Sequence, residues 1–352
     1  MLAGATYDGA GELSYVGYGN KVALQAIGRD QAGRVTSLTW RKPGKVDIVS
    51  TVARSRAGTI IDETLDGVDA RPGSPNYVYD AAGRLTQAWV TGHHYTYDYT
   101  TTTPSGCPKG TQTKAGTNTN RVRLLDKTDK GTAETGYCYD DADRLIGTTG
   151  ANPVTGITYD NHGNTLTYST GGSTTSLGWD SADRNLTASS AGGDPAKVAY
   201  TRDATDRIIR RDTTQGDTTA PTVLYGYTGN GDTADITYDT DKRLSTLTTA
   251  LPGGVLLTNQ NNAQSQPAPT WDYPTIRGDL ALTCDNTGTQ LGDLHTYTPY
   301  GEPLTTTGAV DPDNTPNNQP GQMDYGWLGQ HQRPHEHTGV NRPGSDGGSL
   351  VE

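Results

Sequence analysis

The sequence predicts an all-β fold built from tandem hairpins, and three observations support this prediction. A short phrase recurs along the chain: an aromatic residue, an aspartate, two small residues, then glycine or aspartate, and often an arginine before an aliphatic residue. Among the 352 residues, Gly (45), Tyr (20) and Thr are abundant and Phe is absent. Tyr and Thr favour strands, whereas Gly, Asp and Asn favour the turns between them. No long segment has the apolar period of a helix.

The phrase is densest between residues 137 and 209, where successive aspartates are 20, 20 and 23 residues apart. A nearly constant spacing in the twenties is the signature of a repeat architecture. The aspartates of all nine copies are Asp8, Asp30, Asp80, Asp140, Asp160, Asp180, Asp203, Asp239 and Asp285. Six of the nine aspartates directly follow an aromatic residue: Tyr7, Tyr79, Tyr139, Tyr159, Trp179 or Tyr238.

Each copy is expected to form a hairpin turn. Aspartate suits the first position of a type I turn because its side chain accepts hydrogen bonds from the turn backbone. Glycine suits the fourth position because it adopts positive φ freely, and the two together predict a three-residue loop with a bulge. The glycines expected there are Gly33, Gly83 and Gly163, with Gly11 and Gly288; Asp143, Asp183 and Asp206 tolerate the same conformation. Lys242 takes this position in the copy at Asp239, where we expect a looser turn.

In such a loop the residue before the aspartate faces the fifth residue after it. Tyr7, Tyr79 and Tyr139 then oppose Leu13, Leu85 and Leu145, as cross-strand pairs that stabilise a sheet by roughly 0.2–1 kcal/mol each. The copies at Asp160, Asp180 and Asp285 carry their leucine one residue later. A one-residue slip reverses the faces of a strand, so these copies are expected to use a different loop. We interpret motif aspartates and arginines, such as Asp140 and Arg144, as pairs that fix the turn.

Between the copies, further strands are expected at 46–52, 59–65, 224–227 and 253–257. Tyr95, Tyr97 and Tyr99 alternate over 94–100 and predict a strand with one aromatic face. Segments 101–120, 259–270 and 307–322 are polar and are expected to be exposed loops. Residues 1–339 are treated as one repeat region, and 340–352 as a disordered tail.

Composition limits the function. The net charge of −11 argues against binding to nucleic acid. No apolar run is long enough to span a membrane, and the start has neither the basic region nor the apolar core of a signal peptide. Three cysteines allow a Cys107–Cys138 disulfide in an exported protein, or three isolated thiols including Cys284.

Residues with the right chemistry for a metal or cofactor occur, but their spacing fits no known site. His331, His335 and His337 with Glu336 lack the zinc spacings, and Asp140, Asp141 and Asp143, or Asp311 and Asp313, do not match the calcium loop. The glycine-rich segment 229–234 runs into another expected hairpin rather than a helix, which argues against dinucleotide binding. His93 and His94 are expected to be ordinary surface or wall residues. The sequence therefore predicts no enzyme, no cofactor, no metal and no catalytic residue.

The end of the chain adds a more specific signal. Tandem Tyr-Asp hairpins followed by Tyr297-Thr298-Pro299-Tyr300-Gly301 and Tyr325-Gly326-Trp327-Leu328-Gly329 resemble the Rhs/YD-repeat family, which includes bacterial polymorphic-toxin shells and the teneurin YD shell. The resemblance runs from Tyr7 to about Gly339. It implies a spiralling sheet that closes into a hollow shell, a toxin polypeptide or further shell segments as partners, and a secreted or cell-surface location.

After Thr338-Gly339 the chain departs from the family. The resemblance implies that a core segment with a self-cleaving aspartyl site, and then a toxin, would follow, and neither is seen. We therefore expect a partial shell, truncated before self-cleavage, that encloses or displays a toxin. One alternative is a surface adhesion or carbohydrate-binding protein, because exposed Tyr and Trp stack on sugars. Another is a remnant whose open sheet edges aggregate. An exposed aromatic cluster would favour the binding protein, and buried tyrosines would favour the shell.

Overall fold

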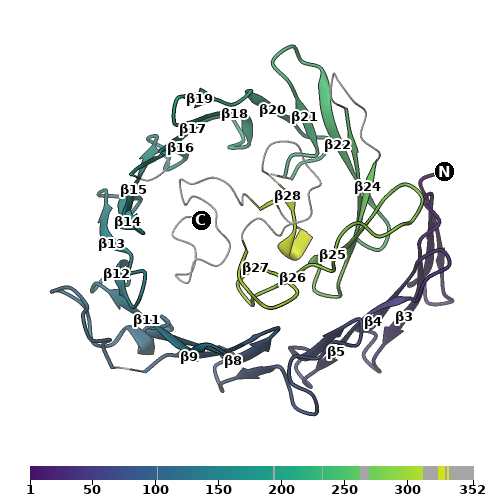
Figure 1. Cartoon of the computed structure of the whole chain (residues 1–352), viewed down its shortest axis with the longest axis horizontal. Helices are drawn as coiled ribbons and strands as arrows, with labels where there is room; N and C mark the ends of the chain where they lie inside the picture. Colours follow the sequence, from purple (N-terminus) through teal and green to yellow (C-terminus); the bar gives the residue numbers. More distant parts are fainter. Residues whose placement is uncertain are drawn as a thin grey trace. The chain divides into compact units, whose positions relative to one another are not determined.

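The computed structural model describes residues 1–100, 102–192, 195–231, 233–261, 269–311, 324–329 and 331–332. Within these ranges the chain forms antiparallel strands and two short 3₁₀ segments, and no α-helix, so the predicted all-β class is confirmed (Figure 1). No helix in these ranges has the length and apolarity needed to cross a membrane. The expected tail 340–352, the segment 262–268 and most of the loop at 307–322 lie outside the described residues.

The chain divides into two compact units. Unit 1 comprises Met1–Val78, Trp89–Gly92 and the described residues of Leu244–Pro334. Unit 2 comprises Tyr79–Ala88 and the described residues of His93–Arg243. The division passes through two strands, β7 (Tyr77–Tyr79) and β8 (Leu85–Val90).

In unit 1, successive strands pair with their neighbours in chain order (Figure 1). The first set is β1 (Ala3–Tyr7), β2 (Leu13–Tyr18), β3 (Ala23–Arg29), β4 (Val35–Arg41), β5 (Ile48–Arg54) and β6 (Ile60–Leu65). The second is β22 (Leu244–Leu251), β23 (Val255–Gln260), β24 (Thr270–Pro274) and β25 (Leu280–Cys284). Short pairs follow: β26 (Thr296–Tyr297) with β27 (Pro303–Leu304), and β28 (Asp324–Tyr325) with β29 (His331–Gln332), beside the 3₁₀ segment η2 (Trp327–Gly329).

The core of unit 1 joins the beginning of the chain to its later strands. The rings of Tyr18 and Trp40 meet those of Trp271 and Tyr273, with centroids 5.6 Å apart for Tyr18 and Tyr273 and 5.1 Å apart for Trp40 and Tyr273. The polar atoms of three of these rings, those of Tyr18, Trp40 and Tyr273, also form hydrogen bonds. The Trp40 indole donates to the carbonyl of Pro274 at 3.0 Å. Close packing of these large aromatic rings, with the polar atoms of Tyr18, Trp40 and Tyr273 hydrogen-bonded, holds β2 and β4 against β24.

Unit 2 repeats the same plan. Its strands are β9 (His93–Asp98), β10 (Arg123–Thr128), β11 (Gly131–Tyr139), β12 (Leu145–Thr149), β13 (Thr155–Tyr159), β14 (Thr165–Thr170), β15 (Ser173–Trp179), β16 (Asn185–Ala191), β17 (Ala196–Arg202), β18 (Ile208–Gln215), β19 (Thr218–Thr219), β20 (Val223–Gly226) and β21 (Ile236–Tyr238). Tyr168, Leu177 and Ala188 form a small buried cluster on one face of the sheet, and the side chain of Trp179 packs against it.

The segment after β9 corrects an expectation. We expected 101–120 to be an exposed loop, but it contains the 3₁₀ segment η1 (Ala115–Asn118), in which Ala115 is buried. The Cys107–Cys138 disulfide forms, with the Cα atoms 5.6 Å apart, and attaches this segment to β11. The amide of Gln112 donates to the carbonyl of Tyr139 at 2.8 Å. Cys284 is the one free cysteine and is buried.

Candidate functional site

The nine motif turns share one backbone geometry. The amide of Asp140 donates to the carbonyl of Arg144 at 2.9 Å, and the amide of Asp143 donates back to the carbonyl of Asp140 at 3.0 Å. The same pair of bonds occurs at all nine aspartates. The fourth residue of every turn has positive φ, between 61° and 96°: Gly11, Gly33, Gly83, Asp143, Gly163, Asp183, Asp206, Lys242 and Gly288. Each copy is therefore a type I turn followed by a left-handed residue.

Two expectations about these turns were wrong. Lys242 does not loosen its turn: its φ is 61° and its amide donates to the Asp239 carbonyl at 3.0 Å. The copies with a late leucine use the same loop as the others, because Tyr159 pairs with Thr165 and Trp179 with Asn185. The loop fixes which residue is paired, and the leucine simply lies one residue beyond it. In the copies at Asp8 and Asp140 the pairs are the expected ones, Tyr7 with Leu13 and Tyr139 with Leu145.

The aspartate side chain holds both sides of the loop. In the Asp140 turn, Oδ1 accepts from the amides of Ala142 at 2.9 Å and Arg144 at 3.0 Å, while Oδ2 accepts from Arg144 Nε at 2.8 Å. The same three contacts surround Asp30, Asp80, Asp180 and Asp203. The hydrogen bond from the Arg184 side chain lowers the pKa of Asp180 to about 2.

A second set of side-chain hydrogen bonds joins one hairpin to the next at eight places. Tyr159 OH donates to the carbonyl of Leu145 at 2.6 Å, and Trp179 Nε1 donates to the carbonyl of Thr165 at 2.8 Å. In each of these bonds the acceptor is the fifth residue after the first residue of the preceding turn. In six of these eight bonds the donor is the residue just before the next turn, and the other two donors are Tyr99 and Tyr227. The other six pairs are Arg29–Leu13, Arg54–Val35, Tyr99–Leu85, Arg202–Asn185, Tyr227–Ile208 and Tyr297–Leu280.

These side-chain donors lie where the backbone ladder between hairpins stops. Pairing of β16 with β17 ends at Thr187 and Ala199, which leaves the carbonyl of Asn185 without a strand partner on that side. Arg202 Nε donates to this carbonyl at 3.0 Å. An unpaired buried carbonyl is destabilising, so the donor extends the cohesion between hairpins to the turn end of the sheet.

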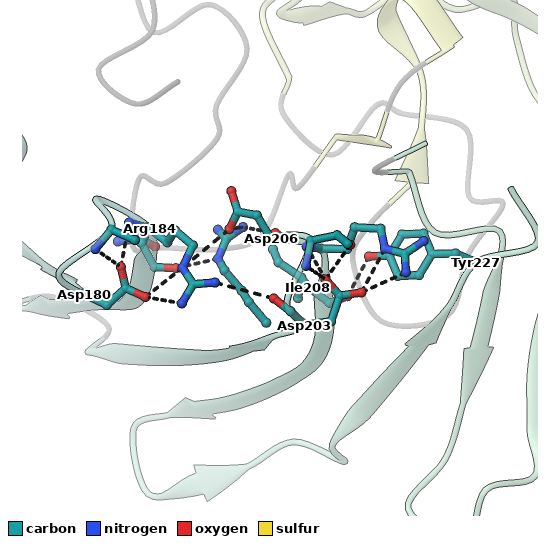
Figure 2. A network of polar contacts seen from close by, with 11 residues as sticks. Asp180, Arg184, Asp203, Asp206, Ile208 and Tyr227 are labelled. Atoms are coloured by element: carbon teal, nitrogen blue, oxygen red, sulfur yellow. Dashed lines mark hydrogen bonds and ion pairs between the residues drawn. The ribbon is translucent and has the colours of Figure 1, made fainter. Parts of the chain in front are cut away.

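The turns of unit 2 also contact one another directly. We call the turns at Asp140, Asp160, Asp180 and Asp203, with the contacts between them, the turn ladder. Figure 2 shows the step from Asp180 to Asp203, where Arg184 Nη1 donates to the carbonyl of Asp203 at 3.5 Å and Nε lies 3.9 Å from Asp206 Oδ1. Tyr227 OH donates to the Ile208 carbonyl at 2.7 Å.

The preceding step of the turn ladder uses a histidine. His162 Nδ1 lies 2.8 Å from Asp183 Oδ1, and Asn164 Nδ2 donates to the same oxygen at 2.7 Å. The hydrogen bond with Asp183 raises the pKa of His162, because the carboxylate favours the protonated ring. Polar side-chain contacts thus join the turns at Asp160, Asp180 and Asp203. In the step from Asp140 to Asp160, the Arg144 guanidinium lies 5.0 Å from the centroid of the Tyr159 ring.

Four further turns of the same geometry escaped the sequence interpretation. They begin at Ser55, Thr275, Thr298 and Thr305, and each has a glycine at the fourth position. A Ser or Thr hydroxyl can replace the aspartate oxygen: the amides of Glu302 and Ala309 donate to Thr298 Oγ1 and Thr305 Oγ1 at 3.0 Å. A search for Ser or Thr three residues before glycine would have found them.

The predicted aromatic residues occupy different environments. Tyr159 and Trp179 are half-buried and bond the preceding hairpin, and Tyr139 OH donates to the Arg121 carbonyl at 3.0 Å. Tyr79 and Tyr238 are half-buried, and the Tyr238 ring lies near Gly226. Tyr7 is 61% exposed. Among the described tyrosines and tryptophans it alone is exposed.

The residues considered for a metal have other roles or lie outside the described ranges. Asp143 Oδ1 accepts from the side-chain amides of Gln112, Asn118 and Asn120 at 2.6, 3.1 and 2.7 Å. His93 Nδ1 lies 2.8 Å from Asp126 Oδ1. Asp313, His335, Glu336, His337 and the His331 side chain are not among the described residues. In the described part of the chain, no three His, Cys, Asp or Glu side chains gather as metal ligands would.

Several solved protein structures share this architecture. No protein-family model and no curated protein sequence matches the chain. The crystal structure of TcdB2-TccC3-Cdc42 matches with a TM-score of 0.62 and 14% identity over 95% of this chain and 18% of that one. TcdB2-TccC3 matches with a TM-score of 0.55 and 14% identity over 94% of this chain and 18% of that one. TcdB2-TccC3 without its hypervariable C-terminal region matches with a TM-score of 0.52 and 14% identity, over 95% and 17% of the two chains.

The chain spans less than a fifth of the length of the structures it matches, 18% in the first two. At 14% identity the likeness is one of fold. The resemblance to Rhs-repeat shells that the Tyr-Asp hairpins indicated is confirmed at this level.

Proposed function

We propose that this chain is a wall segment of an Rhs-type shell that encloses or displays a toxin polypeptide. The observation that carries the proposal is the agreement of fold with TcdB2-TccC3-Cdc42 over 95% of the chain. The chain covers only 18% of that structure. We therefore propose the toxin and the remaining shell segments as its partners. We also propose a secreted or cell-surface location, which the resemblance to Rhs-type shells implies.

The side-chain hydrogen bonds between neighbouring hairpins would strengthen a shell wall. A container made of one sheet layer must resist opening between neighbouring hairpins, because each gap would expose unpaired backbone. Side-chain donors such as Tyr159 and Trp179 donate to carbonyls of the preceding hairpin that lie at the turn end of the sheet. The turn aspartates then act as architecture, and the mechanism is containment rather than catalysis.

Aromatic exposure supports the wall over a carbohydrate-binding surface. A protein that stacks sugars needs a cluster of exposed rings. In the described part of the chain Tyr7 is the exposed ring, whereas Tyr18, Trp40, Trp271 and Tyr273 are buried. We therefore favour containment over adhesion.

Limited proteolysis of the complete gene product that contains these residues tests the proposal. We expect a polypeptide segment outside this chain to resist protease in the native protein and to be digested when it is expressed alone. Reduction of the Cys107–Cys138 disulfide in mild denaturant should open the wall and release the protection. Equal digestion of that segment in both settings would exclude containment.

A further inference from the structure

Unit 1 contains a cavity of about 350 Å³ that the motif turns do not explain. Its apolar lining includes the buried side chains Val52, Val90 and Tyr297, together with the half-buried Ile276 and Trp89. Small-molecule sites in proteins typically occupy roughly 300–1,000 Å³ and have such a lining. The cavity is therefore large enough for one apolar group of side-chain size.

The exposed part of the lining carries negative charge. Asp66 and Asp293 line the cavity and are exposed, and neither carboxylate has a hydrogen bond or an ion pair in the described part of the chain. Val68 also lines the cavity and is 61% exposed, so the exposed part of the lining contains an apolar side chain as well as the two acids. An apolar floor below unpaired carboxylates is the lining that an amphipathic cation requires.

The other carboxylates and the guanidinium that line the cavity do not neutralise these acids. Arg277 Nη1 lies 2.9 Å from Tyr77 OH and 3.5 Å from Glu63 Oε1, and Arg277 Nε lies 3.2 Å from Asp279 Oδ2. One guanidinium is thus shared by two carboxylates, and Asp66 and Asp293 remain in excess. A lining with four carboxylates and one guanidinium attracts cations and repels anions.

From this lining we propose that the cavity binds an organic cation that carries a primary ammonium on an apolar body. The body fills the space lined by Val52, Val90 and Ile276, and the ammonium pairs with Asp66 and Asp293 at the mouth. A free amine and the lysine side chain of a polypeptide present the same chemistry. The assignment rests on unit 1 alone and does not depend on the proposed shell function.

The test compares phenethylamine with its neutral counterpart 2-phenylethanol by tryptophan fluorescence, with Trp89→Phe identifying the reporting ring. We expect saturable binding of the amine and markedly weaker binding of the alcohol. The double variant D66N/D293N should bind the amine about tenfold more weakly, because two surface ion pairs are lost. The matched control D129N/D217N makes the same charge change on exposed turns of unit 2 and should bind like the parent.

A capped Leu-Lys-Leu peptide distinguishes the two sources of the ammonium. Tighter binding of the peptide than of phenethylamine assigns the site to a lysine of a polypeptide, and the reverse order assigns it to a free amine. The proposal is overturned if neither probe binds up to its solubility limit, or if the alcohol binds as well as the amine. It is also overturned if D66N/D293N binds phenethylamine as the control variant does.

Discussion

Removing the hydroxyls that bond one hairpin to the next should weaken unit 2 without altering its rings. In the triple variant Tyr99→Phe, Tyr159→Phe and Tyr227→Phe, each phenol loses one bond to a carbonyl, of 3.2, 2.6 and 2.7 Å respectively. The guanidinium that lies over each ring stays in place, 4.4–5.0 Å from the centroid, because Phe keeps the aromatic face. Burial raises the pKa of Tyr159, so its hydroxyl remains a donor at neutral pH.

A typical hydrogen bond contributes about 1 kcal/mol net, and the three lie on different hairpins, so the triple variant should lose about 3 kcal/mol. For a unit of this size that corresponds to a fall in Tm of about 6–12 °C, measured by calorimetry on the unit 2 transition. Tyr238→Phe is the matched control in the same unit, because its hydroxyl has no hydrogen bond among the described residues. A triple variant that melts with this control would refute the role of the inter-hairpin bonds.

Three further predictions follow from the turns and the disulfide. Gly83→Ala should destabilise unit 2 by about 1–2 kcal/mol, because φ at this position is 81° and a side chain resists it; Gly9→Ala, at a glycine with ordinary φ in the turn at Asp8, should melt like the parent. Reducing the Cys107–Cys138 bond, which closes 31 residues, should lower the stability of unit 2 by about 3–4 kcal/mol, and unchanged calorimetric melts with and without reductant would contradict this. The folded pKa of Asp180 is about 2, below its unfolded value near 3.9, so its ionised form stabilises the fold above pH 3.9 and this stabilisation is lost as the pH falls toward 2. Asp180→Asn should therefore flatten the fall in Tm below pH 4. A parallel fall in Tm in the parent and the variant would contradict this.

The turns could be predicted from the sequence because their determinants are local. An aspartate that bonds amides two and four residues away and a residue with positive φ both lie within one five-residue window. Expecting looseness at Lys242 was wrong because the backbone bonds of the turn tolerate a side chain at that position. The expectation of a second loop type was wrong because the loop, and not the position of the leucine, determines which residue pairs across the strands.

The contacts between hairpins could not be predicted in the same way. Tyr159 stood out as an aromatic residue before an aspartate, but nothing in its own segment indicates that its hydroxyl reaches Leu145, 14 residues earlier. Arginine performs the same task at Arg202, so residue type does not identify the position. The aromatic core of unit 1 depends on still longer separations, since the Trp40 indole bonds a carbonyl 234 residues away.

We have proposed that these hairpins form part of a closed wall around a polypeptide. Cryo-electron microscopy of the complete native gene product tests it most directly. We expect a closed β-sheet wall that contains the hairpins formed by β1 to β27, with density for an enclosed polypeptide inside. An open sheet, or a closed one with an empty interior in the native product, would contradict it.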